Sequence, residues 1–348
     1  MHMKTKFLHL LLITIITGLP LMLFAQADYW ADLVYFSGCP VNHIPKGITI
    51  PDRSMKARAV MNSIIAGSGY AELKQKFPDS LDAILERLCQ GNVIRIQKEK
   101  INILFPVLTG EKREQLNARV KLKIKDCLTG IDSLVIPLRK ELKDHPRLVF
   151  HFLWSRVIDN CWWGLYNQEF NSKKGPPSIA WIIYPPHPYQ CGTNFDQTAN
   201  NSQIAISWSY NIFDEFFTLP STKAFYSLAK HDSLPAKDRD FFMKYGLMDQ
   251  DNSSLLFTYP AGGRLDSLCD SLKSAYTRMI KGMFNYRSLG AEFGIPAPEL
   301  FIIMSHEIAY NIFQQLSEQK KDLFIPILRE TNAGRNFSWL CSFRMERD

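Results

Sequence analysis

The chain has 348 residues, of which 46% are hydrophobic and 22% are charged, and its net charge is +7. This is the composition of a globular protein, and the length suggests about two domains. The same figures exclude a disordered chain, a collagen-like repeat and a membrane protein with several spans. Seven cysteines in a chain of this length are too few for a small disulfide scaffold.

The first 27 residues have the pattern of a secretory signal peptide. Lys4 and Lys6 precede an uncharged apolar run over residues 7–24, and residues 25–27 (Ala-Gln-Ala) supply the small-x-small pattern that signal peptidase recognises. We therefore expect cleavage before Asp28, a periplasmic or secreted mature protein, and no membrane span after cleavage. The alternative is an uncleaved anchor, because the run is just long enough to cross a bilayer.

Cleavage would lower the net charge from +7 to +5, because the removed segment holds two lysines and no acidic residue. A charge this mild does not by itself imply a nucleic-acid partner. The charge is distributed unevenly, however. Residues 95–147 hold 13 Lys and Arg against 7 Asp and Glu.

Three helices and a hairpin are predicted after residue 52. Apolar spacing indicates a first helix over about 53–66, a short second one over 71–77, and a third after the turn at 78–80. Residues 93–97 and 101–105 are typical of two strands joined as a hairpin. The third helix has the cleanest stripe, formed by Leu81, Ile84, Leu85, Leu88 and Cys89.

This order of elements, over residues 53–107, resembles a winged helix-turn-helix. The segment AELKQKFPDSLDAILERLCQGNVIRIQKEKINILFPVLTGEKREQL, residues 71–116, is similar to the winged-helix part of bacterial sensor-type, ArsR-like regulators. In those proteins the wing ends in an apolar-Phe-Pro sequence and runs into a long amphipathic helix, expected here over about 111–128. The resemblance covers roughly a quarter of the mature chain, and it implies DNA binding.

The charge of the third helix argues against that implication. In a helix-turn-helix the outer face of this helix enters the major groove. Here the face holds three carboxylates and one guanidinium, so a phosphate backbone would repel it. The residues are Asp79, Asp82, Ala83, Glu86 and Arg87. The wing is basic, with Arg95, Lys98 and Lys100, but we do not expect nucleic-acid binding.

A second copy of the hairpin is suggested further along the chain. At an offset of 154 residues, GNVIRIQKEKINILFPV aligns without a gap with YGLMDQDNSSLLFTYPA. A short helix over 237–245 is predicted before the second copy, and a long amphipathic helix over about 265–283 after it. A true duplication and a coincidence between two similar hairpins both remain open.

The middle of the chain, residues 147–217, is rich in aromatic residues and holds five of the seven tryptophans. We expect an apolar helix over 148–166, strands over 179–184 and 204–210, and a long loop over 185–203, with Asp196 as its one charged residue, that closes over a ligand pocket. The alternative is that the aromatic residues form an ordinary sheet core. The pocket residues would be Trp162, Trp163, Trp181, His187, Tyr189, Thr193, Asn194 and Trp208.

No catalytic, metal or cofactor motif is complete in the sequence. Ser305-His306-Glu307 lacks the second histidine of a zinc site, because position 310 is Tyr. Cys191 has His187 four residues away, which is a weak pattern for a nucleophile and its base. We expect no cofactor and no metal. The chain is predicted to end with a helix from residue 299 and a strand-like run over 323–328.

Together these patterns predict a helix-rich α+β fold, with winged-helix units flanking a central aromatic-rich α/β sensor-like domain. The expected division is a signal peptide (1–27), a winged-helix-like domain with its long helix (28–130), a central domain (131–220) and a second winged-helix-like unit (221–348). The predicted function is an exported, non-enzymatic binding or sensor-like protein with a small-molecule or protein partner. The alternatives are a DNA-binding regulator and an exported hydrolase that uses the Cys191 and His187 loop.

Overall fold

The computed structural model describes ten segments: residues 34–37, 54–177, 179–184, 187, 191–197, 202–209, 221–244, 247–251, 253–324 and 339–346. The fold is helix-rich α+β, as predicted, with three small sheets. The predicted signal peptide and Cys39 lie outside the described residues. Among the residues that are described, no helix is both long enough and apolar enough to span a bilayer.

The chain forms two compact units, and each unit draws on both halves of the sequence. Unit 1 combines Met1–Arg119, Gly175–Pro188 and Tyr286–Ile303. Unit 2 combines Val120–Lys174, Tyr189–Asn285 and Met304–Asp348. The predicted domain boundaries at 130 and 220 stay predictions.

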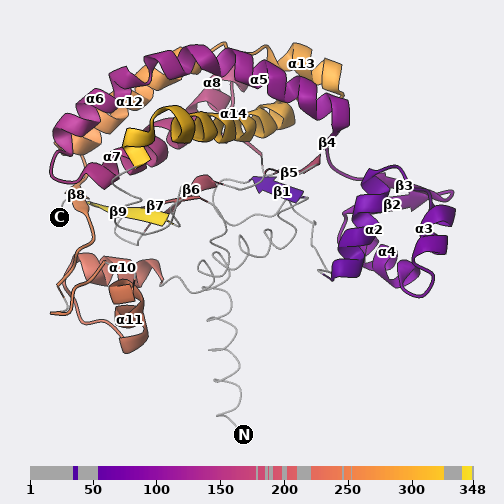
Figure 1. The fold of residues 1–348 in the computed structure, drawn as a ribbon, viewed down its shortest axis with the longest axis horizontal. Helices are drawn as coiled ribbons and strands as arrows, with labels where there is room; N and C mark the ends of the chain where they lie inside the picture. Colours follow the sequence, from indigo (N-terminus) through magenta and orange to yellow (C-terminus); the bar gives the residue numbers. More distant parts are fainter. Residues whose placement is uncertain are drawn as a thin grey trace, which may run out of the picture. The chain divides into compact units, whose positions relative to one another are not determined.

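Unit 1 contains the predicted three helices and hairpin (Figure 1). Their bounds are α2 (Met55–Ile65), α3 (Tyr70–Lys76), α4 (Leu81–Gln90), β2 (Ile94–Gln97) and β3 (Lys100–Ile103). The stripe of α4 is core, as predicted: Leu81, Ile84, Leu85 and Leu88 are at most 2% exposed. They pack with the buried faces of α2 and α3 and with Val93, Ile94 and Ile182 in one cluster.

Local chemistry explains where these elements begin and turn. The Ser54 hydroxyl accepts a hydrogen bond from the Ala57 backbone N–H at 3.2 Å, which caps the start of α2. The hairpin turns at Lys98 and Glu99, both with positive φ, as a two-residue turn of matching twist requires. The hairpin is therefore tight although it has no glycine.

A three-stranded sheet completes the strand content of unit 1. Its order is β1 (Val34–Ser37), β5 (Ile179–Tyr184) and β4 (Val107–Thr109), with β5 antiparallel to β1 and parallel to β4. The long helix α5 (Gly110–Gly130) follows β4 directly, and α13 (Tyr286–Phe293) belongs to the same unit. Arg119 of α5 pairs with Glu292 of α13, and the Lys112 ammonium donates to the Phe293 carbonyl at 3.3 Å.

Unit 2 is built on a four-stranded sheet with the order β6-β7-β9-β8. Its strands are β6 (Cys191–Gln197), β7 (Gln203–Ser209), β9 (Trp339–Met345) and β8 (Thr258–Pro260), and only β8 and β9 are parallel. Its helices include α6 (Asp132–Glu141), α7 (Pro146–Phe152), α8 (Trp162–Phe170), α10 (Thr222–Ala229), α11 (Ala236–Lys244) and α12 (Arg264–Ile280). The last long helix, α14 (Ala297–Gln319), has residues in both units.

Three sequence predictions are wrong in detail, two of them in helical segments and one in the second hairpin. The helix predicted over 148–166 is helical throughout, but a π-helix, η1 (Leu153–Ile158), and a 3₁₀ turn, η2 (Asp159–Cys161), separate α7 from α8. Leu323 and Phe324 are helical rather than extended, because Phe324 packs against Phe150 and Phe313. Residues 325–328 lie outside the described part.

The second hairpin is also corrected. Among the described residues of 247–259, the only antiparallel pairing is the single bridge between Met248 and Ser254. The backbone of β8 pairs with β9 instead, in parallel register. At the offset of 154 residues, β3 corresponds to residues 254–257, so β8 (Thr258–Pro260) begins just after the segment aligned with β3.

The two halves of the chain nevertheless share an order of elements. In each half a first strand is followed by small helices, to which the first half adds the hairpin β2–β3, then by a short strand, a series of long and short helices, and a last strand that lies between the other two. In both sheets the last strand is antiparallel to the first and parallel to the second. The shared order runs β1, β4, β5 in one half and β7, β8, β9 in the other, as an internal duplication would produce.

The buried stripe of α4 gives a test of the core. We expect Leu85→Ala to lower the free energy of unfolding by about 2–5 kcal/mol, because the change leaves a cavity in a packed interior. Leu122→Ala is the matched control, since Leu122 is 71% exposed, and it should change stability by less than about 0.5 kcal/mol. Urea unfolding measures both. Equal, small effects would show that α4 is not packed as described.

Candidate functional site

The structure divides the eight residues of the predicted ligand pocket between the two units. Trp181 and His187 belong to unit 1, and the other residues belong to unit 2. Trp181 is fully buried in β5, as the core alternative predicted. The His187 ring lies 3.5 Å from the Arg113 guanidinium, measured from Nδ1 to Nη2. Tyr189 lies outside the described residues.

Within unit 2, the remaining pocket residues lie on a helix and two paired strands. Trp162 and Trp163 follow each other on α8, and Trp163 is 37% exposed. Thr193 and Asn194 are in β6, and Trp208 is in β7. The binding site formed by the predicted pocket residues therefore stays a prediction. Trp181 is a core residue.

The predicted loop over 185–203 is corrected, because residues 191–197 form strand β6. This strand pairs with β7 along its whole length at the edge of the sheet, so the backbone groups on its β7 side are already hydrogen-bonded. Gly192 lies opposite Trp208, and a Cβ there would come within 2.9 Å of the indole. A glycine is needed for this close approach, and the segment is not a loop that is free to close over a ligand.

Asp159 is the most perturbed carboxyl group near these strands. Burial raises its pKa to about 6, although hydrogen bonds from Thr193 oppose the shift. The group ties the helical turn η2 to strand β6. Because carboxyl groups with raised pKa values gather at functional sites but also occur in structural networks, the shift alone assigns no role.

Burial raises the thiol pKa of five described cysteines, Cys127, Cys161, Cys191, Cys269 and Cys341, which disfavours them as nucleophiles. Burial raises the pKa of Cys191 well above its usual value, and the nearby Asp159 adds to the effect. The thiol form therefore persists at neutral pH, whereas the reactive form is the thiolate. All six cysteines in the described part of the chain are free thiols, namely Cys89, Cys127, Cys161, Cys191, Cys269 and Cys341.

No metal centre is found in the part of the chain that the structure describes. None of its His, Cys, Asp and Glu side chains form a group of three or more that could hold an ion. In the sequence Ser305-His306-Glu307, His306 is exposed whereas Glu307 is 2% exposed. These two side chains therefore do not share one face of α14.

The His151 ring lies between two serine hydroxyl groups, and its role is structural. Its Nδ1 lies 2.7 Å from the Ser207 hydroxyl of β7, and its Nε2 lies 2.8 Å from the Ser342 hydroxyl of β9. Burial, with a smaller effect from Arg156, lowers the pKa of His151 to about 3. All three side chains are fully buried, so a substrate has no access to this serine–histidine pair.

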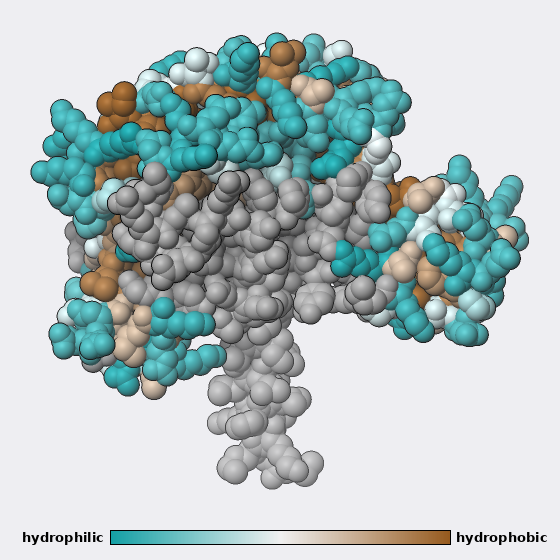
Figure 2. Space-filling view, in the orientation of Figure 1, coloured by the Kyte–Doolittle hydropathy of each residue, from teal (hydrophilic) through white to brown (hydrophobic). Residues whose placement is uncertain are grey.

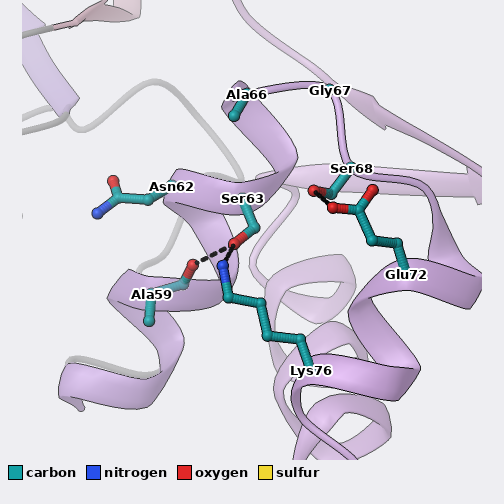
Figure 3. A pocket seen from close by; sticks show the side chains of 8 residues that line it. All are labelled: Ala59, Asn62, Ser63, Ala66, Gly67, Ser68, Glu72 and Lys76. Carbon is teal, nitrogen blue, oxygen red and sulfur yellow. Dashed lines mark hydrogen bonds between the residues drawn. The ribbon is translucent and has the colours of Figure 1, made fainter.

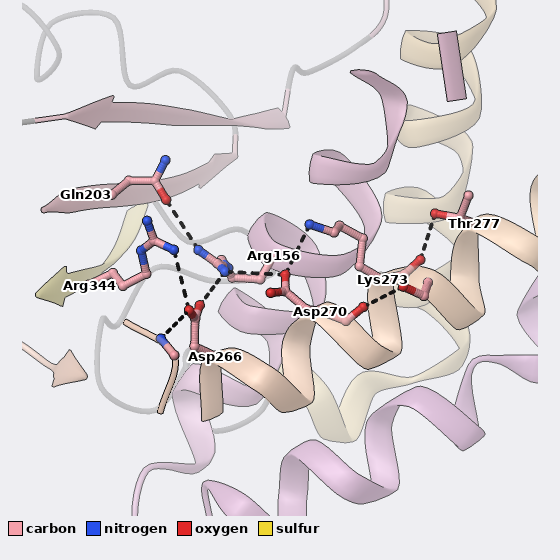
Figure 4. A network of polar contacts seen from close by, with 9 residues as sticks. Arg156, Gln203, Asp266, Asp270, Lys273, Thr277 and Arg344 are labelled. Carbon is pink, nitrogen blue, oxygen red and sulfur yellow. Dashed lines mark hydrogen bonds and ion pairs between the residues drawn. The ribbon is translucent and has the colours of Figure 1, made fainter. Parts of the chain in front are cut away.

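A buried ion-pair network lies beside His151 (Figure 4). The Arg156 guanidinium donates to the Asp266 carboxylate at 2.5 Å, and both side chains are at most 5% exposed. The Asp266 carboxylate also accepts from the Gly262 backbone N–H at 3.0 Å and from Arg344 at 3.4 Å. The second terminal nitrogen of Arg156 donates to Gln203 at 3.3 Å.

The π-helix explains why one helix supplies both polar groups. His151 and Arg156 are five residues apart, a spacing that an α-helix places on different faces. A π-helix bonds residues i and i+5, so five residues make about one turn. Both side chains can therefore face the sheet, and sequence periodicity based on the α-helix could not find the pair.

The described surface has a hollow between α2 and α3 (Figure 3). Its volume is about 540 Å³, and it is open to solvent. The Lys76 ammonium points across it and donates to the Ser63 hydroxyl at 3.1 Å, and Ser68 donates to Glu72 at 2.8 Å. Small and polar side chains line it, namely Ala59, Asn62, Ser63, Ala66, Gly67, Ser68, Glu72 and Lys76.

The outer face of α4 is acidic and exposed. Asp79, Asp82, Ala83, Glu86 and Arg87 all face solvent, as the sequence predicted. Asp82 accepts hydrogen bonds from the Tyr70 hydroxyl at 2.7 Å and from the Lys74 ammonium. These two bonds lower the pKa of Asp82, so this carboxylate stays charged on the face that would meet a partner.

Comparison with known proteins does not identify the site. No family model matches the chain, and neither the curated proteins nor the solved structures that were searched contain a match.

The raised pKa of Asp159 gives a test by pH. The folded state holds the proton more tightly than the unfolded state, whose pKa is near 3.8. Stability contributed by the protonated carboxyl is therefore lost as the pH rises from about 4 through about 6. Asp159→Asn removes this titration, so we expect the variant to gain stability relative to the native chain as the pH rises through this range.

Urea unfolding at several pH values measures that difference. Asp126→Asn is the control for the loss of one carboxylate from the chain, because Asp126 is exposed on α5. A difference for Asp159→Asn that is the same at pH 4 and pH 7 would contradict the account.

Proposed function

We propose that the protein is an exported, non-enzymatic binding or sensor-like protein, whose three-helix-and-hairpin unit acts as a winged-helix surface for a partner other than DNA. The observation that carries the proposal is the exposed acidic face of α4, where Asp79, Asp82 and Glu86 outnumber Arg87 and Lys74, the lysine that pairs with Asp82. On a winged helix this face meets the major groove. Three carboxylates there favour a protein or small-molecule partner over a polyanion.

The hollow between α2 and α3 supports the same proposal. Its volume of about 540 Å³ is large enough for a side chain or a small ligand. It offers a cation at Lys76, a carboxylate at Glu72 and hydroxyl groups at Ser63 and Ser68. A partner with both donors and acceptors would find matching groups at this surface.

The aromatic region is proposed as a second binding surface, limited to the tryptophans that are accessible. Trp162, Trp163 and Trp208 are partly accessible, whereas Trp181 is core. A ligand for this surface would be apolar or aromatic, because stacking on indole rings favours such groups.

Export is part of the proposal and is supported by the sequence pattern of residues 1–27. We expect the N terminus of protein taken from the cell envelope or the medium to be at or near Asp28. N-terminal sequencing decides this, and an intact Met1 in cytoplasmic protein would contradict it.

A DNA-binding regulator is the second candidate, and the exposed basic hairpin favours it. Arg95, Lys98 and Lys100 all face solvent, as the wing of a DNA reader would. The exported hydrolase, the third candidate, finds no support in the buried thiol of Cys191.

A gel-shift series at rising salt tests the first candidate against the second. We expect no sequence-specific binding of duplex DNA. Glu86→Lys should raise non-specific binding, because it replaces a carboxylate on the exposed face of α4 with a cation. Tight binding of the native chain to one sequence that persists above about 150 mM salt would contradict the proposal, since non-specific phosphate contacts weaken steeply there.

A further inference from the structure

The second half of α5 and the helix α6 carry an exposed stripe of lysines and two apolar side chains in unit 2. Leu122 is 71% exposed and Ile136 is 65% exposed, which are the highest values among the described large apolar residues. Lys121 and Lys125 flank Leu122, and Lys140 follows Ile136 by four residues. The outer stripe is defined here as Lys121, Leu122, Lys125, Ile136, Lys140 and Lys143.

The two helices follow each other with helical backbone between them. Ile131, between them, has φ −65° and ψ −28°, which is helical backbone. Leu116, Val120, Ile124, Leu134 and Leu138 are the buried positions, and Leu122 and Ile136 fall on the opposite side of the helical repeat. They are 14 residues apart, which is about four helical turns.

The other charges on α6 are already neutralised. Asp132 pairs with Lys320 at 2.7 Å, Glu141 pairs with Arg264 at 2.8 Å, and Arg139 pairs with Asp322. The four lysines of the outer stripe form no ion pair with any residue that the structure describes. The exposed carboxylates near the stripe are Asp126, Asp144 and the paired Asp132, so the four lysines leave its net charge positive.

Lysines with isolated apolar side chains fit a lipid surface better than a protein partner. A protein partner with high affinity usually needs a contiguous apolar patch with anchors that fill pockets. Here the two apolar side chains project singly and stand about four turns apart. Figure 2 likewise shows hydrophobic side chains standing among hydrophilic ones over the region of α6. A lipid surface accepts such single projections, with lysines reaching the headgroups.

We propose that the outer stripe of α5 and α6 binds an anionic lipid surface. Leu122 and Ile136 enter the headgroup boundary, and the four lysines lie over the negative charges of the lipids. The contact is peripheral and reversible, because two side chains bury little apolar surface. This inference goes beyond the proposed function and does not depend on the acidic face of α4.

Vesicle sedimentation tests it with the chain that begins at Asp28, which keeps every described residue and removes the apolar run over 7–24. We expect binding to vesicles that contain phosphatidylglycerol and none to phosphatidylcholine alone. Salt near 1 M should abolish the binding, because it shortens the Debye length to about 3 Å. Equal binding to both vesicles, or no binding to either, would overturn the proposal.

Charge reversal locates the surface. Each lysine near an anionic surface contributes about fivefold in affinity, so Lys121→Glu with Lys125→Glu should weaken binding by ~25-fold or more. Lys98→Glu with Lys100→Glu changes the net charge equally but lies in the exposed hairpin, and it should leave binding unchanged. Equal weakening by both pairs would overturn the proposal.

The apolar side chains separate a lipid surface from an acidic polypeptide. Leu122→Asn with Ile136→Asn should weaken vesicle binding several-fold, and circular dichroism should show an unchanged fold because both positions are exposed. Unchanged vesicle binding by this variant, together with equally tight binding of poly-glutamate, would show a general attraction to polyanions and overturn the proposal.

Discussion

The buried ion pair between Arg156 and Asp266 is the constraint on which unit 2 depends. A guanidinium removed from water is costly unless a carboxylate and further acceptors surround it. Arg156 comes from the π-helix in the first half of the chain, and Asp266 comes from α12 in the second. The same network reaches β7 through Gln203 and β9 through Arg344. Because one charge pair joins these four elements, the half of the chain that supplies Arg156 cannot complete unit 2 without the other half.

The neighbouring polar groups extend this arrangement and bear on function. His151 joins α7 to β7 and β9, and Asp159 joins η2 to β6. A histidine hydrogen-bonded to serines, or a carboxyl group with a raised pKa, is also what a catalytic site would contain. The full burial of His151 and of its two serine partners shows instead that this group holds helix and sheet together. The accessible charges lie at the surface instead. They are found on the face of α4, in the hollow between α2 and α3, and on the outer stripe of α5 and α6.

The sequence predicts the elements whose pattern is local. The α4 stripe, the hairpin and the long helix α5 are found within a few residues of their expected bounds, because spacing, turn residues and a break at Gly91 decide them. Strand β6 is not predicted because Gly192, Asn194 and Asp196 are residue types depleted in strands, and pairing with β7 decides their conformation. The π-helix is not predicted because its i to i+5 pattern differs from the α-helical spacing used to read the sequence. Trp181 could not be assigned, since a buried indole and a pocket indole give the same pattern.

The central claim is that Arg156 and Asp266 stabilise unit 2 as a coupled pair. A double-mutant cycle with Arg156→Met and Asp266→Leu, followed by urea unfolding, tests it most directly. Each single change should cost about 3–5 kcal/mol, because it leaves one buried charge without its main partner. The double variant should be no less stable than either single variant. Costs that simply add would contradict the account.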